Sequence, residues 1–109
     1  MILPSKELIS EVLSKEVEEE RFIDSNSLTY VNSGIYEDIN IYEFAFKCKE
    51  WAYENNYYVY STPSFALEGV AYIVEDNNIG KRLKTLQLGS EVEAIIQACE
   101  WILNNKDRK

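Results

Sequence analysis

The sequence contains no histidine, so it lacks the side chain that most often acts as a general base and as a metal ligand. Its two cysteines, Cys48 and Cys99, are too few for a zinc site built from paired C-x-x-C ligands. No apolar run reaches the roughly 18–20 residues of a membrane-spanning helix, and the first residues lack a basic segment followed by an apolar one. We therefore expect no metal, no cofactor and no membrane association, in a cytoplasmic protein whose thiols stay reduced.

Length and composition predict one folded domain. The 109 residues lie in the usual range for a single domain, and no segment has the composition of a linker. With 46% hydrophobic and 13% aromatic residues, the chain differs from aromatic-poor, highly charged disordered sequences. We expect a single domain over residues 1–109, which comprises an N-terminal extension (1–39), a core (40–104) and a short tail (105–109).

Acidic residues dominate the charge balance. The formal net charge is -8, and residues 1–43 alone contain ten acidic and three basic residues. A protein that binds DNA or RNA directly gathers lysine and arginine on one face, because neutralising phosphates supplies most of its affinity. The composition therefore argues against direct nucleic-acid binding. An acidic surface favours a basic partner protein, or it serves solubility.

The first third of the chain predicts a helix, a hairpin and a loop. Ser5 is a candidate N-cap, and apolar residues at helical spacing follow it until the helix ends among the acids of residues 16–20. A turn at Ser25–Ser27 separates two short runs of strand-forming residues and predicts a hairpin over residues 22–31. Residues 32–38 begin with Asn-Ser-Gly, and we expect them to form a loop.

Two capping boxes mark longer helices. Asn40 with Glu43 begins the first, which ends at Asn55, and Ser90 with Glu93 begins the second, which runs to about residue 104. The second helix is apolar over most of its circumference, so more than one neighbour must cover it. The apolar stripe expected to face the core in the first helix consists of Phe44, Ala45, Cys48, Trp51 and Ala52.

Three strand-forming segments lie between these helices, at residues 57–62, 69–75 and 81–88, with a turn at residues 76–80. Their short connections favour antiparallel pairing. The expected fold class is α+β, a two-layer arrangement in which two main helices lie on one face of a three-stranded antiparallel sheet, in the order helix-strand-strand-strand-helix. An N-terminal helix and a hairpin precede this core.

No group in the sequence is typical of a catalytic site. Cys48 and Cys99 lie on apolar helix stripes, and no histidine is present to activate them, so we expect buried, structural thiols. Carboxylate pairs such as Glu91 with Glu93 fall at helix starts, helix surfaces or turns, where acids are expected without catalysis. We therefore expect that the protein is not an enzyme.

The acids of the N-terminal third are the first candidate binding site. Such a charge run is either a partner-facing surface or a solvated face that maintains solubility. Its concentration in the part of the chain with the fewest core residues favours the first interpretation. The candidate partner-binding residues are Glu16, Glu18, Glu19, Glu20, Asp24, Glu37 and Asp38.

Three tyrosines form a second candidate site. Strand alternation places Tyr58 and Tyr60 on the face opposite Tyr57, so at least one of the two sets is expected to be exposed. Exposed tyrosines on a sheet stack against bases or form the centre of a protein interface. The alternative is burial against the N-terminal segment.

Two resemblances add to this interpretation. The helix-strand-strand-strand-helix order resembles the double-stranded-RNA-binding fold, but that family has a lysine-rich signature where this chain has Ser90–Ala94, with acidic residues. Local segments are similar to small uncharacterised proteins of bacterial phages and prophages. This likeness implies a phage setting, and it carries no assigned catalytic residues. The segments that carry it are KELISEVL (6–13), INIYE (39–43), CKEWA (48–52) and EAIIQACEWILNNK (93–106).

The leading hypothesis is a non-catalytic, phage-encoded binding protein that docks on a basic surface of a host protein. That surface could be the nucleic-acid channel of a defence nuclease, in which case the carboxylates would imitate phosphates. A toxin-immunity protein would show the same charge pattern. The alternatives are a small-molecule or nucleotide binder that uses the tyrosines, and a homo-oligomer that uses Tyr58, Tyr60 or an open sheet face.

Overall fold

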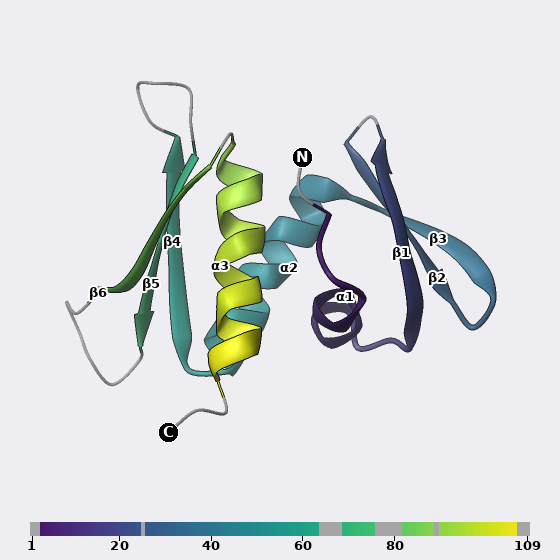
Figure 1. Ribbon diagram of the computed structural model, residues 1–109, viewed down its shortest axis with the longest axis horizontal. Coiled ribbons are helices and arrows are strands. Elements are labelled where there is room, and N and C mark those ends of the chain that lie inside the picture. The colour runs from purple at the N-terminus through teal and green to yellow at the C-terminus, as the bar shows by residue number, and fades with distance from the viewer. Residues whose placement is uncertain (1–2, 25, 64–68, 76–81, 89, 107–109) are drawn as a thin grey trace.

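The computed structural model describes residues 3–24, 26–63, 69–75, 82–88 and 90–106. The predicted turn at residues 76–80 and residues 107–109 of the predicted tail lie outside these ranges. The elements in chain order are α1 (Lys6–Leu13), β1 (Val17–Asp24), β2 (Ser27–Asn32), β3 (Ile35–Asn40), α2 (Ile41–Glu54), β4 (Tyr57–Pro63), β5 (Gly69–Glu75), β6 (Arg82–Leu88) and α3 (Glu91–Asn105) (Figure 1).

The predicted α+β core is confirmed. From α2 to α3 the order is helix, three strands, helix, and β4, β5 and β6 form an antiparallel sheet in that order. Both predicted helix starts are also confirmed. The Asn40 side chain accepts hydrogen bonds from the amides of Tyr42 and Glu43, and the Ser90 hydroxyl accepts one from the amide of Glu93. These caps satisfy amides that have no partner within the helix.

The predicted helix end among the N-terminal acids is wrong. α1 ends at Leu13, and Ser14 follows in the left-handed conformation with a φ of 54°, its amide bonded to the carbonyl of Ser10. Helix cannot continue through such a residue. The acids that follow lie in β1, which pairs along its length with β2.

The predicted loop at residues 32–38 is also wrong, because most of it is a strand. Ser33 and Gly34 have φ values of 52° and 77° and connect β2 to β3 as a two-residue turn. Positive φ at both positions is the conformation that matches the twist of paired strands. The Asn-Ser-Gly sequence therefore marks the tip of a second hairpin. Residues 17–40 form a three-stranded antiparallel sheet in the order β1-β2-β3.

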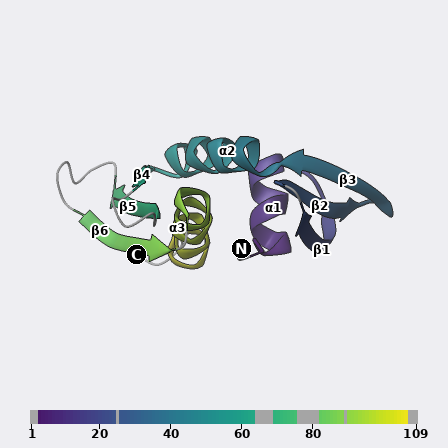
Figure 2. The same cartoon turned by 90° about the horizontal axis from the view of Figure 1, so that it is seen from above.

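Helix α2 connects the two sheets. Figure 2 shows it along the long axis of the molecule, with α1 and α3 both on one side of it. α3 packs on all three strands of the second sheet, while α2 packs on α1, α3 and β4. The Cα positions extend over 43 × 35 × 17 Å, so the molecule is flat.

One buried cluster includes residues from both sheets and all three helices. The predicted stripe of α2 faces this cluster, and all five of its members are buried. Among the largest side chains with almost no exposed surface are Phe44, Leu8, Ile9, Leu28, Ile41, Ile73, Ile96 and Ile102. Burial of this apolar surface is the main force that holds the two halves of the molecule, each built on one of the two sheets, together.

Candidate functional site

The acidic sheet, β1–β3, carries or adjoins all seven candidate acids. Glu16 directly precedes β1, four candidates lie in β1, and two lie in β3. Asp24 pairs through its backbone with Ser27, and its side chain lies outside the described part of the structure. β1 also contains one basic residue, Arg21, whose side chain lies outside the described part of the structure, and β2 and β3 contain none. The N-terminal charge excess therefore becomes one structural unit at an end of the molecule (Figure 1).

Two of the carboxylates lie on the face of this sheet that is turned toward the helices. Glu20 and Glu37 are the cross-strand neighbours of Tyr30, which belongs to the central buried cluster. Cross-strand neighbours share a face, so both carboxylates point the same way as the Tyr30 ring. Both are half-buried. This part of the predicted site is therefore only partly available to a partner.

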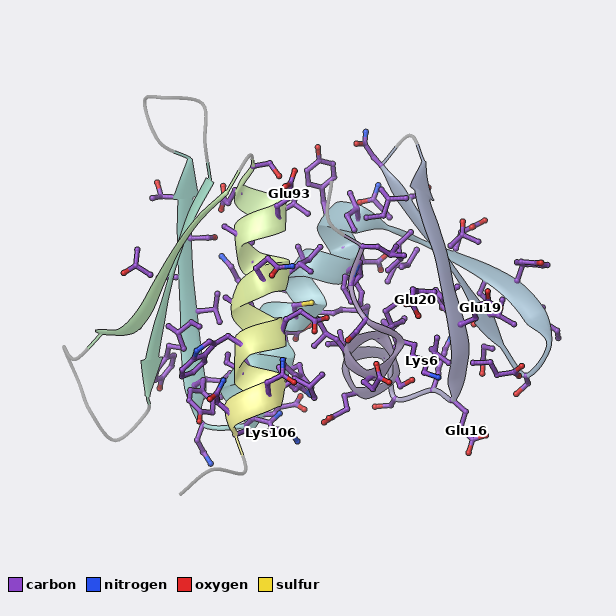
Figure 3. All side chains as sticks on the ribbon, in the orientation of Figure 1. Lys6, Glu16, Glu19, Glu20, Glu93 and Lys106 are labelled. Atoms are coloured by element: carbon purple, nitrogen blue, oxygen red, sulfur yellow. The ribbon has the colours of Figure 1, made fainter. Side chains whose placement is uncertain are left out.

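The opposite face carries further acids. Val31 is buried but does not belong to the central cluster, and its cross-strand neighbours are Glu19 and Tyr36. Thr29, on the same face, is paired with Asp38. Figure 3 shows Glu19 and Glu20 on opposite sides of β1. The candidate acids therefore divide between two faces instead of forming one patch.

Internal hydrogen bonds hold two of the exposed carboxylates. Asp38 accepts a bond of 2.6 Å from the Thr29 hydroxyl, and Glu18 accepts one of 2.8 Å from the amide of Gly34 at the β2–β3 turn. A carboxylate that accepts such bonds keeps its charge and loses some conformational freedom. The outer face and the turn thus present negative charge in fixed positions.

Glu37 has a basic partner. Its carboxylate lies 3.0 Å from the Lys15 ammonium, which also donates to the Tyr30 hydroxyl at 3.3 Å. The hydrogen bond from Lys15 lowers the pKa of Glu37, and the same contact raises the pKa of Lys15. Burial raises the pKa of Tyr30. Lys15 therefore offsets the charge of Glu37, which becomes a weaker candidate for contact with a basic partner.

Replacing Lys15 with methionine should raise the pKa of Glu37 toward its ordinary value of 4.5. Because the pKa of Glu37 is lowered by folding, the pair stabilises the fold above pH 4.5, and this stabilisation is lost as the pH falls through the lowered value. At the alkaline end, the raised pKa of Lys15 means that the stabilisation is lost as the pH rises through a value above 10.5. An NMR titration of the Glu37 carboxyl measures the shift.

The control for this titration is Lys6→Met, which removes an exposed lysine from α1, whereas Lys15 lies between α1 and β1. It should leave the Glu37 titration unchanged. An unchanged titration in Lys15→Met as well would show that the ion pair does not persist in solution.

The three candidate tyrosines differ in exposure. Tyr57 is buried, and its ring meets Trp101 edge-on at 6.4 Å between centroids. Tyr58 is half-buried between Tyr53 and Tyr60, with centroid distances of 5.5 and 6.0 Å. Tyr60 is exposed. Tyr57 is thus a core residue, and the accessible part of this candidate site lies at Tyr58 and Tyr60.

The sequence interpretation missed a second stripe on α2. Tyr42, Phe46 and Tyr53 are each about three-fifths exposed, at 59%, 64% and 62%. Together with Lys49 they follow a spacing of four, three and four residues, which places all four on one face of a helix. We call these four residues the α2 stripe. A helical projection of residues 41–54 shows it, but cannot show that no neighbour covers it.

A groove of about 340 Å³ lies beside this stripe, between α2 and the first turn of α3. Ala45, Val92 and Ile95 give it an apolar floor. The charged side chains among its described lining residues are Lys49 and Glu91, and the Glu91 carboxylate accepts a hydrogen bond of 2.6 Å from Ser61. The groove is large enough for one or two side chains of another molecule.

Both thiols are buried, as expected for structural cysteines. The Cys99 thiol lies 3.4 Å from the carbonyl oxygen of Cys48, and burial raises the pKa of Cys48 well above its usual range. A raised pKa keeps this thiol protonated and unreactive. Within the described ranges, no three acidic or cysteine residues are grouped as a metal site would require, and no helix is long and apolar enough to cross a membrane.

Comparison of the chain with protein-family models, with curated proteins and with solved structures gives no match.

Proposed function

We propose that this protein is a non-catalytic binding protein whose acidic sheet docks on a basic surface of another protein. The observation that carries the proposal is the concentration of carboxylates on β1 and β3, which contain six candidate acids and one basic residue, Arg21. Negative potential of this kind attracts a positively charged partner and speeds its association.

The exposed acids of the sheet have apolar neighbours. Ile35 and Tyr36, at the start of β3, are 65% and 62% exposed. Charged groups contribute mainly to the rate and specificity of association, while aromatic and aliphatic contacts contribute most of the affinity. The combination of fixed carboxylates with an exposed isoleucine and tyrosine is thus suited to a protein surface, in preference to a free cation.

The proposed setting is a phage protein that acts on a host protein. A basic nucleic-acid channel is one surface that the carboxylates of the outer face would fit, because they would occupy positions of phosphates. An immunity protein that covers a basic toxin would use the same chemistry. The partner that is recovered decides between these two roles.

Reversing three exposed charges tests the proposal. In Glu16→Lys/Glu18→Lys/Glu19→Lys the acidic sheet loses three carboxylates that are all exposed. A basic partner isolated from a bacterial lysate at low salt should associate with this variant at least roughly tenfold more slowly than with the wild type. Stopped-flow or surface-based kinetics at two salt concentrations measure the rate, and higher salt should reduce the difference.

The matched control reverses three exposed carboxylates outside the acidic sheet, in Glu7→Lys/Glu50→Lys/Glu54→Lys. It changes the net charge by the same amount. It therefore distinguishes an effect of the acidic sheet on the association rate from an effect of the overall charge. The control should associate nearly as fast as the wild type. Equal slowing in both triple variants, or in neither, would contradict a docking role for β1–β3.

A further inference from the structure

The α2 stripe gives α2 a second apolar face. The first face, which includes Phe44 and Trp51, is buried in the core. The second carries three of the six large apolar side chains that are prominently exposed in the described chain. A helix that is apolar on two sides normally has neighbours on both. None of the described residues covers this second face, and Tyr42, Phe46 and Tyr53 stay exposed.

The residues of the α2 stripe have an order that suits self-association. Their spacing of four, three and four residues reads the same in both directions along the helix. When two copies of α2 pack antiparallel about a two-fold axis, Tyr42 faces the partner subunit's Tyr53. Phe46 faces the partner subunit's Lys49. Aromatic pairs and an ammonium over an aromatic ring are both favourable contacts.

We propose that the α2 stripe is the interface of a two-fold symmetric dimer of this protein. Two-fold symmetry repeats every contact. Each copy therefore packs its aromatic residues against the other copy and also supplies a groove that receives residues of the other copy. Tyr53 is held in place by its contact with Tyr58, which extends the interface toward β4. The aromatic residues would lose most of their contact with water in this arrangement.

Charge complementarity favours a second copy over an unrelated protein. The cation of the α2 stripe is Lys49, which lines the groove together with the carboxylate of Glu91. In the antiparallel arrangement, each Lys49 lies over the partner subunit's Phe46 and therefore at the mouth of a groove that contains Glu91. The chain thus contains both members of this ion pair, Lys49 and Glu91. In the two-fold symmetric dimer the pair would form twice between the copies.

The dimer would leave the acidic sheets free. The acidic sheet lies at one end of the long axis, whereas α2 lies in the middle of the molecule (Figure 1). A dimer through α2 would therefore carry two acidic sheets, and two linked sites bind a repeated or two-fold partner more tightly than one. The inference does not depend on the proposed function, because the dimer is measured without any partner.

Sedimentation velocity from low-micromolar to near-millimolar protein tests the dimer. The wild type should be dimeric at the upper end, and Phe46→Asp should raise the dimer dissociation constant at least roughly tenfold, as expected for an aromatic residue central to an interface. Ile35→Asp is the matched control, because Ile35 is as exposed as Phe46 but lies in β3. It should dimerise like the wild type.

A charge exchange tests the arrangement of the two copies. Lys49→Glu and Glu91→Lys should each weaken the dimer, because each places like charges together twice. A mixture of the two variants should form a heterodimer, in which opposite charges again face each other. Restored association shows that both variants fold, so misfolding cannot explain the loss.

Three results would overturn the proposal. They are a wild-type protein that stays monomeric over the whole concentration range, equal effects of Phe46→Asp and Ile35→Asp, and variants that do not associate when mixed. Native mass spectrometry adds one more outcome: a monomer that retains a small molecule would assign the groove to a ligand instead of a second copy.

Discussion

Phe44→Ala is expected to destabilise the protein by about 3–5 kcal/mol, the range found when a fully buried phenylalanine is truncated in a packed core. Phe44 has no exposed surface, and it is the largest side chain in the structure's described part that is buried to that extent. It lies in α2, the helix that contacts both α1 and α3. A cavity at this position therefore weakens the contacts between the two halves of the molecule. Urea unfolding followed by circular dichroism measures the change in free energy.

Phe46→Ala is the control, because it removes the same side chain two positions later in the same helix. Phe46 is 64% exposed, so at protein concentrations that keep the chain monomeric its truncation should change the free energy of unfolding by no more than about 0.5 kcal/mol. A small effect of Phe44→Ala, or similar effects of both variants, would show that the buried face of α2 is assigned wrongly.

Glu100→Ala is expected to cost about 1.5–3 kcal/mol, the usual range for hydrogen bonds to a charged group. The Glu100 carboxylate accepts a bond of 2.8 Å from the Ser5 amide and one of 2.9 Å from the Ser5 hydroxyl. Ser5 is also the N-cap of α1. Removing the carboxylate leaves a half-buried amide without its acceptor and releases the start of α1 from α3. Thermal and urea unfolding measure the loss.

Glu100→Gln separates the shape of this side chain from its charge. The amide oxygen can still accept one bond from Ser5, so this variant should lose less stability than Glu100→Ala. Glu7→Ala, which truncates an exposed glutamate in the first turn of α1, should have little effect. If Glu100→Ala is as stable as the wild type, the contact between Ser5 and Glu100 contributes nothing to the free energy of unfolding in solution.

Local signals in the sequence were sufficient to locate most of the core. Asn40 and Ser90 mark the starts of α2 and α3 because a side-chain oxygen that satisfies early helical amides works within a single turn. The buried stripe of α2 follows from helical periodicity, and β4–β6 follow from runs of strand-forming residues. None of these features needs a distant part of the chain.

In the N-terminal third, pairing between strands decided which residues form secondary structure and which faces they occupy. The hairpin predicted over residues 22–31 is present as the paired ends of β1 and β2, but the sequence did not show that β2 is buried at four consecutive positions, on both faces. β1 is rich in glutamate, which has little intrinsic preference for strands, and it becomes a strand because β2 supplies hydrogen-bond partners. Its register also contains two irregularities, which set the faces that Glu19 and Glu20 occupy.

The sequence by itself determined the charge of the candidate site, the class of the core and the positions of its longer helices. Composition is independent of conformation, and caps and helical stripes act over a few residues. Only the tertiary structure decided which carboxylates share a face and which aromatic residues stay exposed. Phe44 and Phe46 are chemically identical and two positions apart, yet one is buried and the other is exposed. The difference arises because burial depends on the elements that pack around a helix, and the helix's own sequence does not contain them.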